Sequence, residues 1–217
     1  MLEWIARGLR KGRVTTRYPS RATTQLGATP PDAFDGEITT VGVEQRESER
    51  VRAACAAGAI VLVAGGGAPL STGAANLRRS IHVRHIDCGS DGSEEWEIQA
   101  LWNPFYDVQR LGFFPTNAPR HADLLLVTGP VTAAMRMPLL RTWEVMPNPK
   151  ALLAVGDDAC GVGLHSDSDA QSLCAGAVDR VLPVDVYVPG SPPPPIAILQ
   201  GLLLAAGINS AALEAAA

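Results

Sequence analysis

Acidic side chains stand at two places where the sequence predicts that a strand ends. The stretch D-C-G-S-D-G-S-E-E-W-E-I, from Asp87 to Ile98, follows a strand-like run and opens a helix-like one, and it places Asp91 and Glu94 at the spacing of a metal-ligand loop. A second stretch, L-L-A-V-G-D-D-A, places Asp158 after another apolar strand. Loops at the carboxyl ends of parallel strands gather at one edge of a sheet, where α/β proteins usually hold their chemistry. We therefore expect these acidic loops to lie together.

The elements that must position these loops alternate regularly along the chain. Strand patterns cover 81–86, 122–127, 151–155 and 180–188, and helical patterns cover 94–101, 134–146 and 195–206. Apolar strands that alternate with helices indicate a parallel sheet covered on both faces. The sequence thus predicts an α/β fold with a doubly wound, mainly parallel, flavodoxin-like sheet. Upstream, a charged helical segment runs into an apolar strand, and Gly65–Gly67 is interpreted as a connector because the spacing of a nucleotide-binding loop is missing.

Composition excludes several classes of protein. With 217 residues, 47% of them hydrophobic and 18% charged, the chain has the makeup of a globular protein with one main domain and an appendage. Its formal net charge of -4 gives no general reason to expect a nucleic-acid partner. The sequence has neither an apolar run of about 18 residues nor the pattern of a secretory signal. We therefore expect a cytoplasmic protein whose cysteines are reduced. These are Cys55, Cys88, Cys160 and Cys174, and none of them forms a C-x-x-C pair.

The first 21 residues are unusually basic. Six Arg or Lys side chains oppose the single acid Glu3, and Leu2, Ile5 and Leu9 recur at helical spacing. This pattern predicts an amphipathic basic helix, followed by an extended linker up to residue 36 that is rich in Pro, Thr, Ser and Gly. Such a helix docks onto a membrane protein or a bilayer surface, or it packs on its own domain.

Several separate motifs, in the same order, resemble one protein family. They are H-V-R-H-I-D-C-G-S, N-P-F-Y-D-V-Q-R-L-G, P-R-H-A-D-L-L-L-V-T-G-P-V-T, M-P-N-P-K-A-L-L-A-V-G-D and V-D-R-V-L-P-V-D-V-Y-V-P-G-S-P-P-P-P. Together they resemble the small electron-transfer subunit of respiratory complex I, an NADH-quinone oxidoreductase. They are more similar still to the matching small subunit of membrane-bound, complex I-related [NiFe]-hydrogenases. The resemblance runs from Ile81 to about Leu204 and so covers more than half of the chain.

The resemblance implies a cluster site whose ligands have changed. In that family four cysteines hold one [4Fe-4S] cluster, and the first two stand in a G-S-C-x-x-C-E loop. The two loop cysteines correspond here to Asp91 and Glu94, the third to Asp158 and the fourth to Ser191. A [4Fe-4S] cluster takes thiolates, which are soft ligands suited to iron and sulfide, whereas carboxylates and hydroxyls are hard oxygen donors. The resemblance therefore predicts that the scaffold is kept and that the cluster is absent.

A second resemblance lies upstream of the main domain. Some relatives carry a ferredoxin-like insertion with the pattern C-x-x-C-x-x-C-x-x-x-C-P, and A-C-A-A-G-A-I resembles its end. The four ligand positions would then be Gln45, Ser48, Val51 and Cys55, of which only the last is a cysteine. The expected division of the chain is a basic helix and linker at 1–36, a degenerate ferredoxin-like segment and connector at 37–80, the α/β domain like the complex I small subunit at 81–206, and a tail at 207–217.

Three converging carboxylates would need compensation, because like charges at short distance cannot all stay ionised. If the family fold holds, Asp91, Glu94 and Asp158 point into one small cavity. A hard divalent cation such as Mg²⁺ or Ca²⁺ would neutralise them, as would a retained proton or an Arg or Lys from this chain or a partner. The remaining alternative is that the loops have rearranged and the acids are solvated at the surface.

The favoured interpretation is a cluster-free structural subunit that is not catalytic on its own and does not carry electrons. It would stand between a partner like the hydrogenase large subunit, or its counterpart in complex I, and a membrane-arm subunit. It would thus be peripheral at the inner face of the membrane. In the family, T-T-R-Y-P lies near the partner and the quinone side. The matching residues here are Thr15, Thr16, Arg17, Tyr18 and Pro19.

Two alternatives stay open at this point. One is a working oxidoreductase subunit with an unusual metal centre at Asp91, Glu94 and Asp158, joined by Cys88 or Cys160. The other is a stand-alone module whose pocket binds a cation or a basic peptide.

Overall fold

Short apolar segments form the sheet at the centre of the protein. The computed structural model describes residues 36–42, 49–64, 80–165 and 174–207. Seven strands make up the main sheet: β1 (Ile38–Gly42), β2 (Ile60–Ala64), β3 (Ile81–Asp87), β4 (Phe113–Pro115), β5 (Leu124–Thr128), β7 (Ala151–Val155) and β9 (Val186–Val188). Two further strands, β6 (Val131–Thr132) and β8 (Cys174–Gly176), pair antiparallel beside it.

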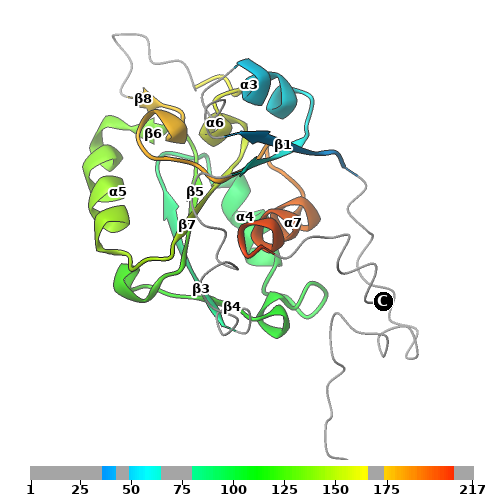
Figure 1. Ribbon diagram of the computed structural model, residues 1–217, viewed down its shortest axis with the longest axis vertical. Helices are drawn as coiled ribbons and strands as arrows, with labels where there is room; N and C mark the ends of the chain where they lie inside the picture. Colours follow the sequence, from blue (N-terminus) through cyan, green and yellow to red (C-terminus); the bar gives the residue numbers. More distant parts are fainter. Residues whose placement is uncertain (1–35, 43–48, 65–79, 166–173, 208–217) are drawn as a thin grey trace, which may run out of the picture.

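The main sheet has the order β1-β2-β9-β7-β5-β3-β4 (Figure 1). Strands β3, β4, β5, β7 and β9 pair in parallel, and β2 pairs antiparallel with β9. Strands β1 and β2 are parallel to each other, so they run against the other five. Both come from the segment 37–80 and extend the same sheet at β9. The predicted α/β fold with a doubly wound, mainly parallel sheet is confirmed.

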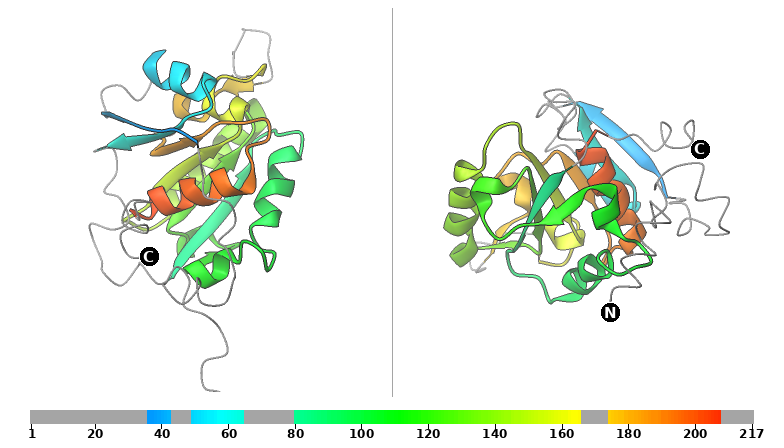
Figure 2. Two further views of the ribbon diagram at one scale, coloured as in Figure 1. Left: turned by 90° about the vertical axis from the view of Figure 1, so that its right-hand side faces the viewer. Right: turned by 90° about the horizontal axis from the view of Figure 1, so that it is seen from below.

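Helices cover both faces of the sheet (Figure 1; Figure 2). Helices α4 (Ser93–Ala100) and α7 (Pro195–Ala205) pack on one face, and α3 (Glu49–Ala56), α5 (Ala133–Val145) and α6 (Asp157–Cys160) pack on the other. Single 3₁₀ turns, η3 (Val108–Leu111), η4 (Pro119–His121) and η5 (Val178–Arg180), lie in the connections.

Successive side chains of the central strands enter the two cores alternately. In β5, Leu124 and Leu126 pack with α4 and α7, whereas Leu125 and Val127 pack with the helices of the opposite face. All of β5 and all of β7 are buried, as expected for parallel strands that are covered on both faces. The sheet is thus a rigid base for the loops at its carboxyl edge.

Most predicted elements lie within a few residues of the observed ones, but the strand predicted at 180–188 is much shorter than expected. Residues Val178–Arg180 form η5, and only Val186–Val188 form a strand. Pro183 interrupts the apolar run because it has no backbone N–H for a ladder. The predicted basic helix, the linker, the Gly65–Gly67 connector and nearly all of the tail lie outside the described residues.

Candidate functional site: an acidic cavity at the carboxyl edge of the sheet

A cavity of about 510 Å³ opens where three strands of the sheet end. The loops after β3, β7 and β9 supply its walls, as the topology requires for an α/β site. The structure brings together all four residues that were aligned with cluster ligands in the sequence, Asp91, Glu94, Asp158 and Ser191. Asp157 joins them, so four carboxylates face one space. That these positions correspond to the family's cluster ligands stays a prediction.

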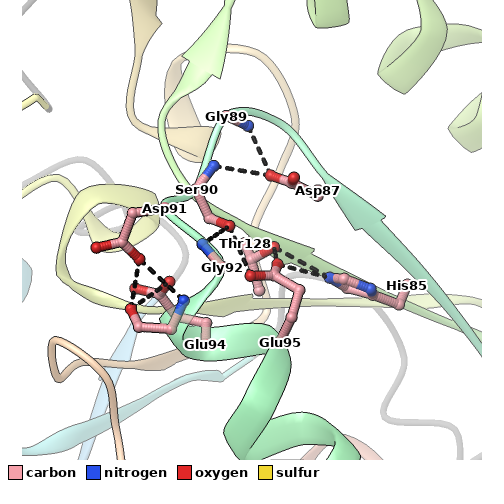
Figure 3. Close-up of polar contacts among 10 residues, drawn as sticks. His85, Asp87, Gly89, Ser90, Asp91, Gly92, Glu94, Glu95 and Thr128 are labelled. Atoms are coloured by element: carbon pink, nitrogen blue, oxygen red, sulfur yellow. Dashed lines mark hydrogen bonds and ion pairs between the residues drawn. The ribbon is translucent and has the colours of Figure 1, made fainter.

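Hydrogen bonds within the loop after β3 fix its shape (Figure 3). Asp87 Oδ1 accepts from the backbone N–H groups of Gly89 at 2.8 Å and Ser90 at 2.7 Å. Asp91 Oδ1 accepts from the Ser93 N–H at 2.9 Å and from the Ser93 hydroxyl at 2.6 Å. These bonds from Ser93 hold the pKa of the exposed Asp91 carboxyl below its usual value. Asp91 is therefore an anion at the mouth of the cavity.

Glu94 is the buried acid of the site, with 5% of its surface exposed. Burial raises the pKa of its carboxyl, and the hydrogen bond from the Ser93 hydroxyl at 3.2 Å opposes this effect. The side chain passes over Gly156, which has a φ of +99°, and a Cβ there would lie 2.6 Å from Glu94 Oε1. A residue with a side chain at position 156 would compete for the same space. Gly156 thus makes room for the buried carboxylate.

The two acids of α6 bond the neighbouring loops. Asp157 Oδ1 accepts from the Gly190 N–H at 2.7 Å, and the Asp157 N–H donates to the Gly190 carbonyl at 2.9 Å. This pair of bonds fixes the loop that carries Ser191. Asp158 Oδ1 accepts from the His165 N–H at 2.8 Å. Both acids are half-buried, and each has a structural role that the sequence pattern did not indicate.

A polar network around Glu95 connects this cavity to a second one (Figure 3). Glu95 Oε2 accepts from the Ser90 hydroxyl at 2.6 Å, and Glu95 Oε1 accepts from the buried Thr128 hydroxyl at 2.5 Å. His85 Nε2 lies 3.0 Å from Thr128 Oγ1 and 3.4 Å from Glu95 Oε1. Ser90 lines the acidic cavity, whereas His85 and Glu95 line a smaller cavity of about 240 Å³ between β3 and α4. No spacing rule in the sequence reveals this contact between Glu95 and Thr128.

Cysteine thiols take no part in lining the acidic cavity within the described part of the chain. Cys88 is fully buried at the end of β3, and burial raises the pKa of its thiol to about 12. Cys160 is also fully buried, and its thiol lies 3.7 Å from the Ala154 carbonyl oxygen. Neither of the two cysteines named for an unusual metal centre therefore lines the cavity that holds Asp91, Glu94 and Asp158.

The donor set of the cavity is made of oxygen atoms, with His165 beside them. Over the described ranges, no three side chains of His, Cys, Asp or Glu are placed to hold one metal ion. The three predicted carboxylates share the cavity without converging as ligands on a single point. That a hard cation binds at Asp91, Glu94 and Asp158 stays a prediction.

Some predicted positions fall elsewhere or outside the described residues. Val51 and Cys55 are buried on the face of α3 that packs into the core, so they belong to the packing of this helix. Gln45, Ser48 and the segment 15–19 lie outside the residues that the structure describes.

Sequence comparison decides the family. The model of the family "NADH ubiquinone oxidoreductase, 20 Kd subunit" matches residues 88–205, which is more than half of the chain. The chain belongs to this family. Formate hydrogenlyase subunit 7 of Escherichia coli is 43% identical over 132 residues, which cover 61% of this chain and 51% of that protein. A probable membrane-bound hydrogenase subunit of Pyrococcus furiosus is 42% identical over 129 residues, covering 59% of this chain and 75% of that one.

A solved membrane complex contains a chain of similar fold. A chain of the membrane-bound sulfane sulfur reductase, an archaeal respiratory membrane complex, superposes with a TM-score of 0.52 at 30% identity. The match covers 62% of this chain and 73% of that one. The chain spans about half the length of formate hydrogenlyase subunit 7. Among the described helices, none is both long and apolar enough to cross a membrane.

The cluster usual in the 20 kDa subunit family does not fit these donors. A [4Fe-4S] cluster needs about four thiolates, and the described wall of the cavity offers carboxylates, serine hydroxyls and one imidazole. Hard oxygen ligands match neither iron nor sulfide well. The residues of this cavity therefore give no basis for an electron-transfer step through it.

Proposed function

We propose that this protein is an architectural small subunit of a complex I-related or hydrogenase-type membrane complex, and that it does not carry electrons. The observation that supports this most strongly is the acidic cavity. Asp91, Glu94, Asp158 and Ser191 come from three separate loops and still surround one space. In the resemblance these are the positions of the cluster ligands. A protein that keeps the scaffold but replaces every cluster ligand can still occupy the small-subunit place in an assembly, although it lacks the redox centre itself.

The alternative of an unusual metal centre has weaker support. It would require Cys88 or Cys160 to supply a thiolate beside the acids. Both thiols are fully buried, and burial raises the pKa of each. A thiol with a raised pKa is a poor metal ligand because the thiolate is the form that binds.

The proposed partners are a protein like the hydrogenase large subunit, or its counterpart in complex I, and a membrane-arm subunit. The names of the relatives, a formate hydrogenlyase subunit and a membrane-bound hydrogenase subunit, support partners of that kind. Leu164 stands at the wall of the acidic cavity with 96% of its surface exposed, and Trp96 on α4 is 73% exposed. We take these two side chains as candidate contacts with the proposed partners, because aromatic and other large side chains are enriched at protein interfaces.

The first experiment measures the cofactor directly. The protein is purified without oxygen, and iron, acid-labile sulfide and divalent metals are determined together with the absorption spectrum. We expect no stoichiometric iron or sulfide. About four irons per chain with matching sulfide would refute the proposal, because the cluster would then be present on ligands other than those identified here.

A four-cysteine variant serves as the matched control for that measurement. Asp91→Cys, Glu94→Cys, Asp158→Cys and Ser191→Cys are combined, and cluster reconstitution is attempted side by side with the unmodified protein. We expect the variant to take up a cluster and the unmodified protein to remain without one. Failure of a folded variant to bind iron would count against the correspondence of these four positions with cluster ligands.

The second experiment tests the architectural role. The chain is co-expressed with the large-subunit homologue of the same genome, and co-purification is compared for the unmodified protein, Leu164→Ser and Met137→Ser. Met137 is 50% exposed on α5 and provides a control on another surface. We expect Leu164→Ser alone to weaken co-purification. A stable monomer that recruits no large subunit would instead favour the stand-alone binding module.

A further inference from the structure

The smaller cavity, of about 240 Å³ between β3 and α4, shares no lining residue with the acidic cavity. Glu95, His85 and Trp102 are the side chains of its wall that can recognise a charged or polar group. The other walls are mainly apolar, and they include Val83, Ile98, Leu101, Leu126 and Leu202. An apolar cavity with a few polar groups is the usual form of a small-ligand site. A water molecule takes up about 30 Å³ in the liquid, so a ligand of roughly eight non-hydrogen atoms has room here.

Glu95 gives this wall a negative charge. Its carboxylate oxygens accept from the hydroxyls of Ser90 and Thr128, which are neutral donors, and no Arg or Lys of the described residues forms an ion pair with it. Arg84 also borders the cavity, but side chains alternate along β3 and Val83 packs on the α4 face, so the Arg84 side chain lies on the opposite face. The Glu95 side chain is only 21% exposed, so water screens its charge incompletely.

The hydrogen bonds around Thr128 determine which nitrogen of His85 carries a proton (Figure 3). Thr128 donates its single hydroxyl proton to Glu95, so its Oγ1 accepts from His85 Nε2, 3.0 Å away. Burial lowers the pKa of His85, which keeps the ring neutral at neutral pH. Nδ1 therefore has a lone pair and no proton, and no described residue donates to it. His85 thus offers a hydrogen-bond acceptor to a ligand.

We propose that this cavity binds a small primary amine in its protonated form, an ammonium group on an apolar body. The ammonium group lies beside the Glu95 carboxylate and donates a hydrogen bond to His85 Nδ1. The apolar walls surround the body of the ligand, and the ring of Trp102 adds its attraction for a cation. An anion is repelled by Glu95, and a neutral ligand leaves the Glu95 charge without a partner. The site does not depend on the proposed architectural function.

The test compares two aromatic probes of about the size of the cavity, benzylamine and benzyl alcohol. They have nearly the same shape, and each has a hydrogen-bond donor, but only benzylamine is charged at neutral pH. Both are titrated into the purified full chain, and binding is followed by ligand-observed NMR. We expect benzylamine to bind at least about tenfold more tightly, since a hydrogen bond between charged groups commonly contributes such a factor.

Substitution of Glu95 locates the site. Glu95→Gln removes the charge and nearly keeps the shape, so it should weaken benzylamine about tenfold and leave benzyl alcohol unchanged. Glu144→Gln is the matched control, because Glu144 lies on α5 with a side chain that is 58% exposed. This control should bind both probes as the unmodified protein does. Trp102→Leu should weaken benzylamine more than benzyl alcohol.

Three outcomes would overturn the proposal. Benzylamine does not bind the unmodified chain, the two probes bind it equally well, or Glu95→Gln binds benzylamine as tightly as the unmodified chain does. The first two outcomes are measured on the unmodified protein, so they decide the question even if Glu95→Gln does not fold.

Discussion

Replacing Arg52 by Met should destabilise the protein strongly. Arg52 Nη2 lies 2.7 Å from Asp179 Oδ1 and 2.6 Å from Asp179 Oδ2, and the Asp179 side chain has no exposed surface. The Tyr187 hydroxyl, at 3.3 Å, is the other side-chain donor to this carboxylate among the described residues. Without Arg52 the buried charge depends on that long hydrogen bond. Removal of one partner from a buried ion pair costs about 3–5 kcal/mol, a large part of the stability of an ordinary domain.

Urea unfolding followed by tryptophan fluorescence measures this loss as a lower midpoint at an unchanged slope. Arg141→Met is the control, because Arg141 and Glu144 form an ion pair whose side chains are 71% and 58% exposed. An exposed pair of this kind contributes about 0–1 kcal/mol. The control should therefore unfold almost as the unmodified protein does.

A double-mutant cycle separates the buried charge from general damage to packing. Asp179→Asn removes the charge, so Arg52→Met should cost much less in that background than in the unmodified protein. The reasoning is refuted if Arg52→Met lowers the free energy of unfolding by less than about 1 kcal/mol, or if its cost is the same in both backgrounds.

Three further substitutions test the acidic cavity and the polar network beside it. Glu94→Gln should stabilise the protein at neutral pH. Burial raises the pKa of Glu94 in the folded state, so the protein loses stability as the pH rises through that pKa and the carboxyl ionises. Glutamine has no proton to lose and avoids this loss. The gain should disappear below the reference pKa of 4.5, as urea titrations at several pH values will show. Gly156→Ala should cost about 1–3 kcal/mol in the same assay, since φ is +99° and a Cβ would meet the Glu94 carboxylate. Thr128→Val should cost about 1–3 kcal/mol, because the Glu95 carboxylate loses a buried donor while the shape is kept.

The part of the fold that the sequence could predict is the part set by local patterns. The run Ala151–Val155 is apolar throughout and Ile81–Ile86 places apolar residues on both faces, and both became parallel strands of the sheet. The meeting of the acidic loops also followed, because it depends only on parallel strands ending at one edge. At 180–188 the same approach predicted too long a strand, because apolar residues on either side of Pro183 imitate one continuous strand, whereas only Val186–Val188 form it.

Contacts between distant segments could not be predicted from one sequence. Arg52 and Asp179 are 127 positions apart, and nothing near either residue specifies the other. The burial of Glu94 depends on the space above Gly156, which exists only once β7 and α4 are in place. The same holds for Thr128 and Glu95, 33 positions apart on β5 and α4.

Hydrogen bonds within and between the loops would allow the proposed cluster-free small subunit to keep its shape. In the family a cluster bonded to loops after several strands would hold those loops together as a cross-link. Here Asp157 joins α6 to Gly190 through two hydrogen bonds, and Asp87 fixes the loop after β3 through two more. Arg52 joins α3 to α6 through the Cys160 carbonyl and to η5 through Asp179. The cavity walls are thus connected through the protein itself, so the loops can stay in place with only carboxylates between them.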